Sequence, residues 1–131
     1  MRIVPWAIAV LLGFSAAAQA KPPLCNDEDA GKIVRIDVIV DEKRVEPKEC
    51  TVAPGTKVVW FMEEGDKEFE ADFGKGAPGT GNETRFKGKK VLWHQEAKMT
   101  ARAVDEATTF DYSLIVEGEA YDPAIIIDPG K

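Results

Sequence analysis

The chain has 131 residues, of which 44% are hydrophobic and 31% are charged, and its formal net charge is −6. A chain of this size ordinarily forms one domain with a core of its own. The acidic balance argues against binding to nucleic acid or to an anionic lipid surface, because both reward Lys and Arg side chains that contact phosphate. It leaves open an acidic surface that meets a basic partner.

Residues 1–20 have the pattern of a secretory signal peptide. Arg2 supplies a basic start, an apolar run follows, and Ala18-Gln19-Ala20 is a small-x-small cleavage pattern. A membrane-spanning helix is the alternative, but the apolar run is shorter than the roughly 20 residues that a bilayer needs. We therefore predict a periplasmic or secreted protein, cleaved near Ala20, with no membrane insertion. Loss of Arg2 leaves 16 basic and 23 acidic residues, a net charge of −7 with the single histidine neutral.

The polar lead-in, residues 21–32, contains Cys25, and the only other cysteine is Cys50. An exported protein with one Cys pair most simply forms a disulfide, because its compartment is oxidising. A closed loop of about 25 residues would contribute roughly 3 kcal/mol in the chain-entropy model. The alternative is two reactive or metal-binding thiols, although a redox pair is usually closer in sequence. The spacing favours a structural disulfide between the lead-in and the segment that enters Thr51-Val52.

The domain, residues 33–131, shows the period of two that is typical of strands. In the clearest example, apolar residues at 69, 71 and 73 alternate with acidic ones. Similar runs occupy 34–40, 57–62, 99–103, 110–116 and 125–127. Six or more short strands with turns at this spacing predict an all-β antiparallel sandwich or barrel. The aromatic residues expected in its core are Trp60, Phe61, Phe69, Phe73, Phe110 and Tyr112.

Two segments between these strands have a different character. Residues 74–90, GKGAPGTGNETRFKGKK, hold five glycines and little apolar content, which predicts a long flexible loop. Residues 91–97 are compatible with a short helix or with an irregular crossover. Loops carried on a rigid scaffold are where binding usually resides, so the 74–90 loop is a candidate binding element.

The order of several motifs resembles the cupredoxin family, the plastocyanin and azurin β-sandwiches. Residues 45–52, VEPKECTV, are like the family's Pro-containing strand, and 53–60, APGTKVVW, are like its proline-glycine turn and Val-x-Trp strand. Phe110-x-Tyr112 is like the aromatic approach to the copper loop, and 125–127 like the terminal strand. The resemblance covers most of the mature chain and implies an antiparallel Greek-key β-sandwich.

The copper ligands implied by the resemblance are absent from the corresponding positions. Such a site needs a thiolate and two imidazoles, with a weak axial ligand. The first His corresponds to Glu68-Phe69, the Cys to Leu114, the second His to about Glu117, and the Met to about Tyr121. Composition therefore excludes blue-copper electron transfer, and no cofactor is expected. Leu114 alternates with two aromatic residues and is expected to fill the core.

Acidic residues gather in two stretches, at 63–72 and at 117–122. If both stretches meet at one pole of the sandwich, they would offer oxygen ligands to a hard cation, with Glu68, Glu117 and Asp122 as candidates. The alternative is a solvated rim, and no EF-hand spacing supports a metal site.

Residues for catalysis are scarce. The mature chain has one Ser, Ser113, and one His, His94, with no motif around either, so we expect no enzyme. Trp93 and Tyr121 lie outside the clear strands. They are candidates to contact a partner, or else to cover one end of the core.

The sequence thus predicts a small exported cupredoxin-like protein without a copper site. We expect a monomer that acts as a non-catalytic binding or accessory module of the cell envelope, with an unknown protein partner and no nucleic acid. The alternative is a metal-handling or redox-accessory protein that uses carboxylates, or a partner's ligands, in place of the missing set.

Overall fold

The computed structural model describes residues 21–131, so the predicted signal peptide lies outside the described residues. All regular structure in this range is β, which confirms the all-β class. The strands are β1 (Ile33–Ile39), β2 (Arg44–Glu46), β3 (Glu49–Val52), β4 (Lys57–Met62), β5 (Phe69–Asp72), β6 (Arg85–Lys87), β7 (Lys89–Val91), β8 (His94–Thr100), β9 (Thr108–Asp111), β10 (Ser113–Val116), β11 (Glu119–Tyr121) and β12 (Ala124–Ile127).

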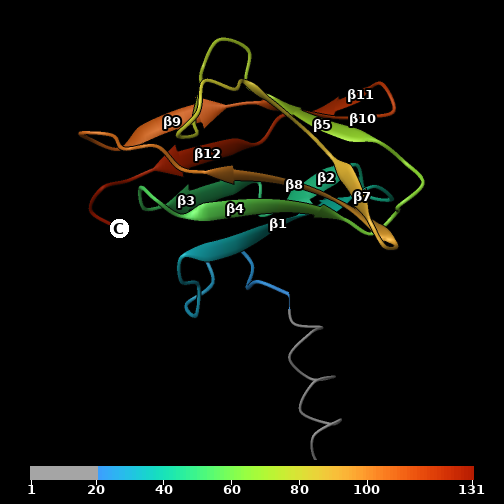
Figure 1. The fold of residues 1–131 in the computed structure, drawn as a ribbon, viewed down its shortest axis with the longest axis horizontal. Helices are drawn as coiled ribbons and strands as arrows, with labels where there is room; N and C mark the ends of the chain where they lie inside the picture. The colour runs from blue at the N-terminus through green and yellow to red at the C-terminus, as the bar shows by residue number, and fades with distance from the viewer. Residues whose placement is uncertain (1–20) are drawn as a thin grey trace, which may run out of the picture.

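The strands form a two-layered sandwich. A five-stranded sheet of order β2-β1-β4-β8-β7 makes one layer. A four-stranded sheet, β11-β10-β5-β6, and a three-stranded sheet, β3-β12-β9, contribute the strands of the other. In Figure 1, β5, β9, β10 and β12 lie above β4 and β1. The chain passes from the three-stranded to the four-stranded sheet between β9 and β10, at Tyr112.

The sandwich is mixed rather than wholly antiparallel, which corrects the expectation in this detail. Of the nine strand pairs in the described range, β1–β4 and β3–β12 are parallel. The reason is the path of the chain. After β1 and its antiparallel neighbour β2, the chain leaves for the other layer as β3 and returns as β4 beside β1. Ile36 of β1 therefore pairs with Trp60 of β4 in a parallel register.

The period-two alternation produces the core as expected. Along β1 the buried residues are the alternate ones, and β10 and β12 also direct buried residues inward. These inward side chains are apolar and largely β-branched, so they fill the space between the layers without polar groups that need partners. The fully buried residues include Ile36, Trp60, Met62, Leu114, Ile125 and Ile127.

Four aromatic rings form the centre of the core. Phe73 stacks on Tyr112 with ring centroids 4.5 Å apart, and Trp60 packs against both rings and against Phe86. Trp60 Nε1–H donates a hydrogen bond of 3.0 Å to the Tyr112 hydroxyl. Phe61 is a correction, because it lies on the outer face of the sheet, half-buried against the ring of His94.

The expectation of a long flexible loop at 74–90 is wrong for its second half. Residues 85–87 are β6, and residues 89–91 are β7. Phe86 is buried in the core, Pro78 is fully buried, and Gly79 forms a β-bridge with Ala101. The many glycines and lysines of this segment gave no strand pattern in the sequence. Phe86 nevertheless faces the core, and residues 85–87 pair with β5 as a short strand.

Residues 91–97 are neither a helix nor a crossover. Val91 ends β7 and pairs with His94, the first residue of β8, so the two strands form a tight hairpin with Leu92 and Trp93 as its turn. A two-residue hairpin turn usually contains Asn-Gly or a similar pair, which can be recognised in the sequence. Leu-Trp gives no such signal, so the sequence pattern could not reveal the turn.

The lead-in is tied to the sandwich. Cys25 and Cys50 form the expected disulfide, with a Cα–Cα distance of 5.6 Å. Cys25 N–H donates to the Arg35 carbonyl at 2.8 Å, and Arg35 N–H donates to the Pro23 carbonyl at 2.8 Å. Residues 23–25 therefore run beside β1. The Asn26 side chain adds a clamp on β3, where it bonds to Glu49 and Thr51.

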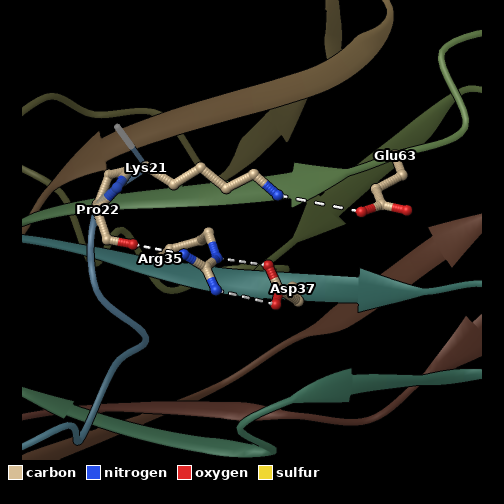
Figure 2. A network of polar contacts seen from close by, with 5 residues as sticks. All are labelled: Lys21, Pro22, Arg35, Asp37 and Glu63. Atoms are coloured by element: carbon tan, nitrogen blue, oxygen red, sulfur yellow. Dashed lines mark hydrogen bonds and ion pairs between the residues drawn. The ribbon is translucent and has the colours of Figure 1, made fainter. Parts of the chain in front are cut away.

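The first described residues cross the outer face of the five-stranded sheet (Figure 2). The Arg35 guanidinium bonds to the Pro22 carbonyl and, at 2.7 Å, to the Asp37 carboxylate. Lys21 lies with its Nζ 4.3 Å from the centre of the Phe61 ring and 4.0 Å from the Glu63 carboxylate. These contacts hold residues 21 and 22 against the five-stranded sheet.

Candidate functional site

Core residues, Phe69 and Leu114, occupy two of the positions that the resemblance relates to copper ligands, whereas Glu68 and Glu117 are exposed. Leu114 is fully buried, and its cross-strand neighbours are Ala71 and Tyr121. Phe69, one residue after Glu68, is also buried, and it pairs with Val116. Side chains of this kind offer no thiolate or imidazole, so this part of the fold serves packing.

The three candidate cation ligands do not come together. Glu68 and Glu117 are both exposed, and they line an open hollow that also contains Lys67 and Lys87. Lys67 forms an ion pair of 3.5 Å with Glu117. Asp122 does not line this hollow. Among residues 21–131 there is no group of three or more His, Cys, Asp or Glu side chains arranged to hold a metal ion.

Tyr121 lies in a different hollow. A groove of about 500 Å³ runs between β2 and β11, each of which pairs with only one strand. Val45 and Tyr121 are among its lining residues, and Lys43 and Glu119 form an ion pair of 3.4 Å in it. Partial burial raises the pKa of the Tyr121 hydroxyl above its ordinary value, and the charge of Glu119 adds to the effect.

Trp93 is the most exposed large apolar residue of the described chain. Its exposed fraction is 80%, that of Leu92 is 73%, and that of Val91 is 41%. Sequence reasoning identified Trp93 but missed its two neighbours. Their exposure follows from the turn between β7 and β8, which no turn motif in the sequence marks. We call residues 91–93 the hairpin tip.

The backbone of the hairpin tip is held from behind. Gly65 lies so close to the hairpin that a Cβ there would be 2.3 Å from the carbonyl oxygen of Trp93. The buried side chain of Gln95 donates a hydrogen bond of 2.9 Å to the Gly65 carbonyl. Gly65 thus permits a close approach between two backbones, and the side-chain bond of Gln95 fixes their separation.

His94, the one histidine, has structural contacts on several sides. Its Nε2 lies 2.5 Å from the Glu96 carboxylate, and its ring packs 4.3 Å from the Phe61 ring. Lys98 also approaches Glu96, at 3.7 Å. Ser113 lies on β10 and makes a register pair with Asp72. The two residues considered for catalysis are on strands of different sheets.

The comparisons with solved structures show the fold. An oxidised proline-to-glycine mutant of amicyanin, a cupredoxin, aligns with a TM-score of 0.51 and 20% identity, over 84% of this chain and 95% of that one. An oxidised proline-to-alanine mutant of amicyanin aligns with a TM-score of 0.50 and 19% identity over the same shares. The sandwich therefore has the cupredoxin fold.

No family model and no curated protein sequence matches the chain. Within residues 21–131 there is no helix that is long and apolar enough to cross a membrane. The fold is thus established by structural likeness alone, and the function has to be argued from the side chains that the fold presents.

Proposed function

We propose that this chain is an exported, non-catalytic module of the cell envelope that binds a protein partner on a copper-free cupredoxin scaffold. The observation that carries the proposal is the hairpin tip, where Leu92 and Trp93 are 73% and 80% exposed on a backbone fixed against Gly65. Large apolar side chains held rigidly in water are costly for the isolated chain and are typical of surfaces that become buried in a complex.

The scaffold supports binding rather than chemistry. Leu114 is packed where the resemblance implies a cysteine, and His94 is held by Glu96 and Phe61. The disulfide between Cys25 and Cys50 suits an oxidising compartment, and the signal-peptide pattern of residues 1–20 is consistent with export. A rigid sandwich with an exposed turn is a common way to present a binding surface.

The metal-handling alternative has weaker support. Glu68 and Glu117 share a hollow with two further carboxylates, but Lys67 and Lys87 line it too, and Lys67 already forms an ion pair with Glu117. A hard cation takes six or more oxygen ligands, and positive neighbours oppose its binding. Among the described residues these carboxylates do not form a group arranged to hold a metal ion, so the hollow suits a solvated surface better than a cation site.

An affinity experiment tests the proposal. The mature chain, residues 21–131, is immobilised and exposed to envelope extract, and a protein retained by it is purified and titrated by calorimetry. We expect a saturable complex of defined stoichiometry. In parallel, titration with Ca²⁺ and with Cu(II) should show no stoichiometric binding and no intense thiolate-to-copper absorption. A chain that forms no saturable complex but is stabilised by one of these ions would support metal handling instead.

Mass spectrometry of the protein recovered from its cells tests the compartment. We expect a chain that begins near Lys21 and is two hydrogens lighter than the reduced form, because the disulfide is formed. An intact leader, or two free thiols, would contradict export.

A further inference from the structure

The hairpin tip has an unfavourable backbone conformation that no packing within the chain offsets. Leu92 has a backbone φ of 56°, in the left-handed region that favours Gly, Asn or Asp. Its side chain is 73% exposed, so packing within the molecule does not compensate for this backbone conformation. A residue that is locally unfavourable and is not used by the fold itself points to a use outside the fold.

Charged residues of opposite sign lie on the two sides of the hairpin tip. The turn that packs behind Trp93 carries Glu63, Glu64 and Asp66, and only Glu63 among these three has a cationic partner, Lys21 at 4.0 Å. On β7, directly before the tip, lie Lys89 and Lys90, both exposed.

The strand order places these charges. In the five-stranded sheet, β8 lies between β4 and β7. The acidic turn follows β4 and the two lysines belong to β7, so β8 separates them. Glu96 on β8 pairs in register with Lys89 but is already engaged by His94 and Lys98. The apolar tip therefore has an acidic side, formed by the 63–66 turn, and a basic side, formed by Lys89 and Lys90.

We infer that the hairpin tip seats in an apolar recess of a partner protein, whose rim is basic where it meets the 63–66 turn and acidic where it meets Lys89 and Lys90. This inference rests on the proposed binding function and adds the surface and the chemistry of the partner. The tip is a convex turn, so a flat protein surface would leave Trp93 and Leu92 partly in water. A recess buries both side chains, and the paired charges orient the complex.

A lipid surface fits these observations less well. Trp beside Lys is a combination found at membrane interfaces, and the tip has Lys89 and Lys90 next to Trp93. A bilayer, however, presents one sign of charge along its surface, and anionic headgroups would repel the acidic turn that lies against the tip. A protein rim can complement both signs, and for this reason we commit to a protein partner.

Photo-crosslinking in the exporting cells tests the inference. Trp93 is replaced by p-benzoylphenylalanine, and the matched control carries the same residue in place of Lys75, which is exposed in a loop far from the tip in sequence. We expect one discrete protein adduct from position 93 and none from position 75. Peptide mapping should place the adduct at an apolar residue with Lys or Arg close to it in the partner.

Charge reversal and truncation make the test specific. The paired changes Glu64→Lys with Asp66→Lys, and Lys89→Glu with Lys90→Glu, should each lower the adduct yield several-fold. With the partner purified, Trp93→Ala should raise the dissociation constant about thirtyfold, as expected for a buried aromatic anchor. Because Trp93 is 80% exposed, this change should leave the unfolding midpoint nearly unchanged, which separates binding from folding.

The contrary outcomes are distinct. An adduct with lipid, binding to vesicles of phosphatidylethanolamine and phosphatidylglycerol that Trp93→Ala abolishes, or an adduct between two copies of this chain would overturn the inference. An adduct yield that is unchanged in both charge-reversal variants would also overturn the inference. If affinity isolation yields a saturable partner and position 93 gives no adduct, the inference fails while the binding function stands. If neither experiment yields a partner, the proposed function itself fails.

Discussion

The indole Nε1–H of Trp60 donates a buried hydrogen bond of 3.0 Å to the hydroxyl of Tyr112, and this bond joins the two layers of the sandwich. Trp60 belongs to β4 of the five-stranded sheet, and Tyr112 lies between β9 and β10. Both side chains are buried, so the indole N–H finds its acceptor inside the core. The bond therefore fixes how the layers face one another in addition to filling the core.

Tyr112→Phe should destabilise the fold by about 1–3 kcal/mol at neutral pH, because it leaves the buried Trp60 N–H without an acceptor. The ring is retained, so its stacking on Phe73 at 4.5 Å should survive. Urea unfolding followed by fluorescence measures the loss. Tyr121→Phe is the matched control, since Tyr121 is only partly buried, and it should change stability by no more than about 0.5 kcal/mol.

The same variant should alter the response to alkaline pH. Burial raises the pKa of Tyr112, and the hydrogen bond from Trp60 lowers it to a smaller extent. The folded chain thus holds this proton more tightly than the unfolded chain, whose tyrosine titrates near pH 10. The stability from this group is complete below about pH 10 and is lost as pH rises through the folded pKa.

We therefore expect the wild type to lose stability above about pH 10 more steeply than Tyr112→Phe does. Unfolding midpoints measured across this range check the slope. Equal slopes for the two proteins would show that Tyr112 does not titrate with unfolding.

Gly65→Ala should destabilise the chain by about 1–3 kcal/mol, because a Cβ at this position would be 2.3 Å from the Trp93 carbonyl oxygen and backbone must move. Displacement of the turn should also break the Gln95 bond to the Gly65 carbonyl. Gly31→Ala is the control, as nothing lies within 4 Å of a Cβ there. Thermal unfolding and amide exchange at residues 91–95 measure both effects, and a neutral Gly65→Ala would contradict the close docking.

Leu92→Gly should stabilise the isolated chain. Relief of a left-handed backbone is worth roughly 1–2 kcal/mol, and the greater freedom of glycine when unfolded offsets roughly 0.5–1 kcal/mol of it. We expect a net gain of about 0.5–1 kcal/mol. Trp93 has no positive φ, so Trp93→Gly should give no gain. A gain in stability together with a loss of partner binding would link the strained turn to function.

Removal of the disulfide should cost about 3 kcal/mol, because a sequence separation of 25 residues constrains the unfolded chain. The double change Cys25→Ala with Cys50→Ala is compared with the wild type, each with and without a reducing agent, in guanidinium unfolding. Reduction should lower the midpoint of the wild type and leave that of the double variant unchanged. A wild type insensitive to reduction would mean that the bridge contributes nothing to stability.

Most of the strands and their inward faces could be predicted from the sequence. The alternation at Phe69, Ala71 and Phe73 predicted which side chains are buried, because a period of two is set by the backbone itself, whereas in the run of Trp60 it missed the buried Val59. The pair Cys25 and Cys50 predicted the bridge for a similar reason, since no other cysteine competes for either thiol. The resemblance added the cupredoxin fold, which structural likeness then confirmed.

Only the tertiary structure decided how these pieces meet. The parallel pairing of β1 with β4 depends on the path through β3, and that path leaves no mark in the alternation of either strand. Phe86 became a core residue because β5 and Trp60 lie beside it, although its own segment is rich in glycine and lysine. Leu92 and Trp93 became a turn because Gly65 and Gln95 hold the hairpin in place, and no local preference of leucine or tryptophan foretells that. A strand's period is a property of a few consecutive residues, whereas its partners and its turns depend on contacts between residues far apart in the chain.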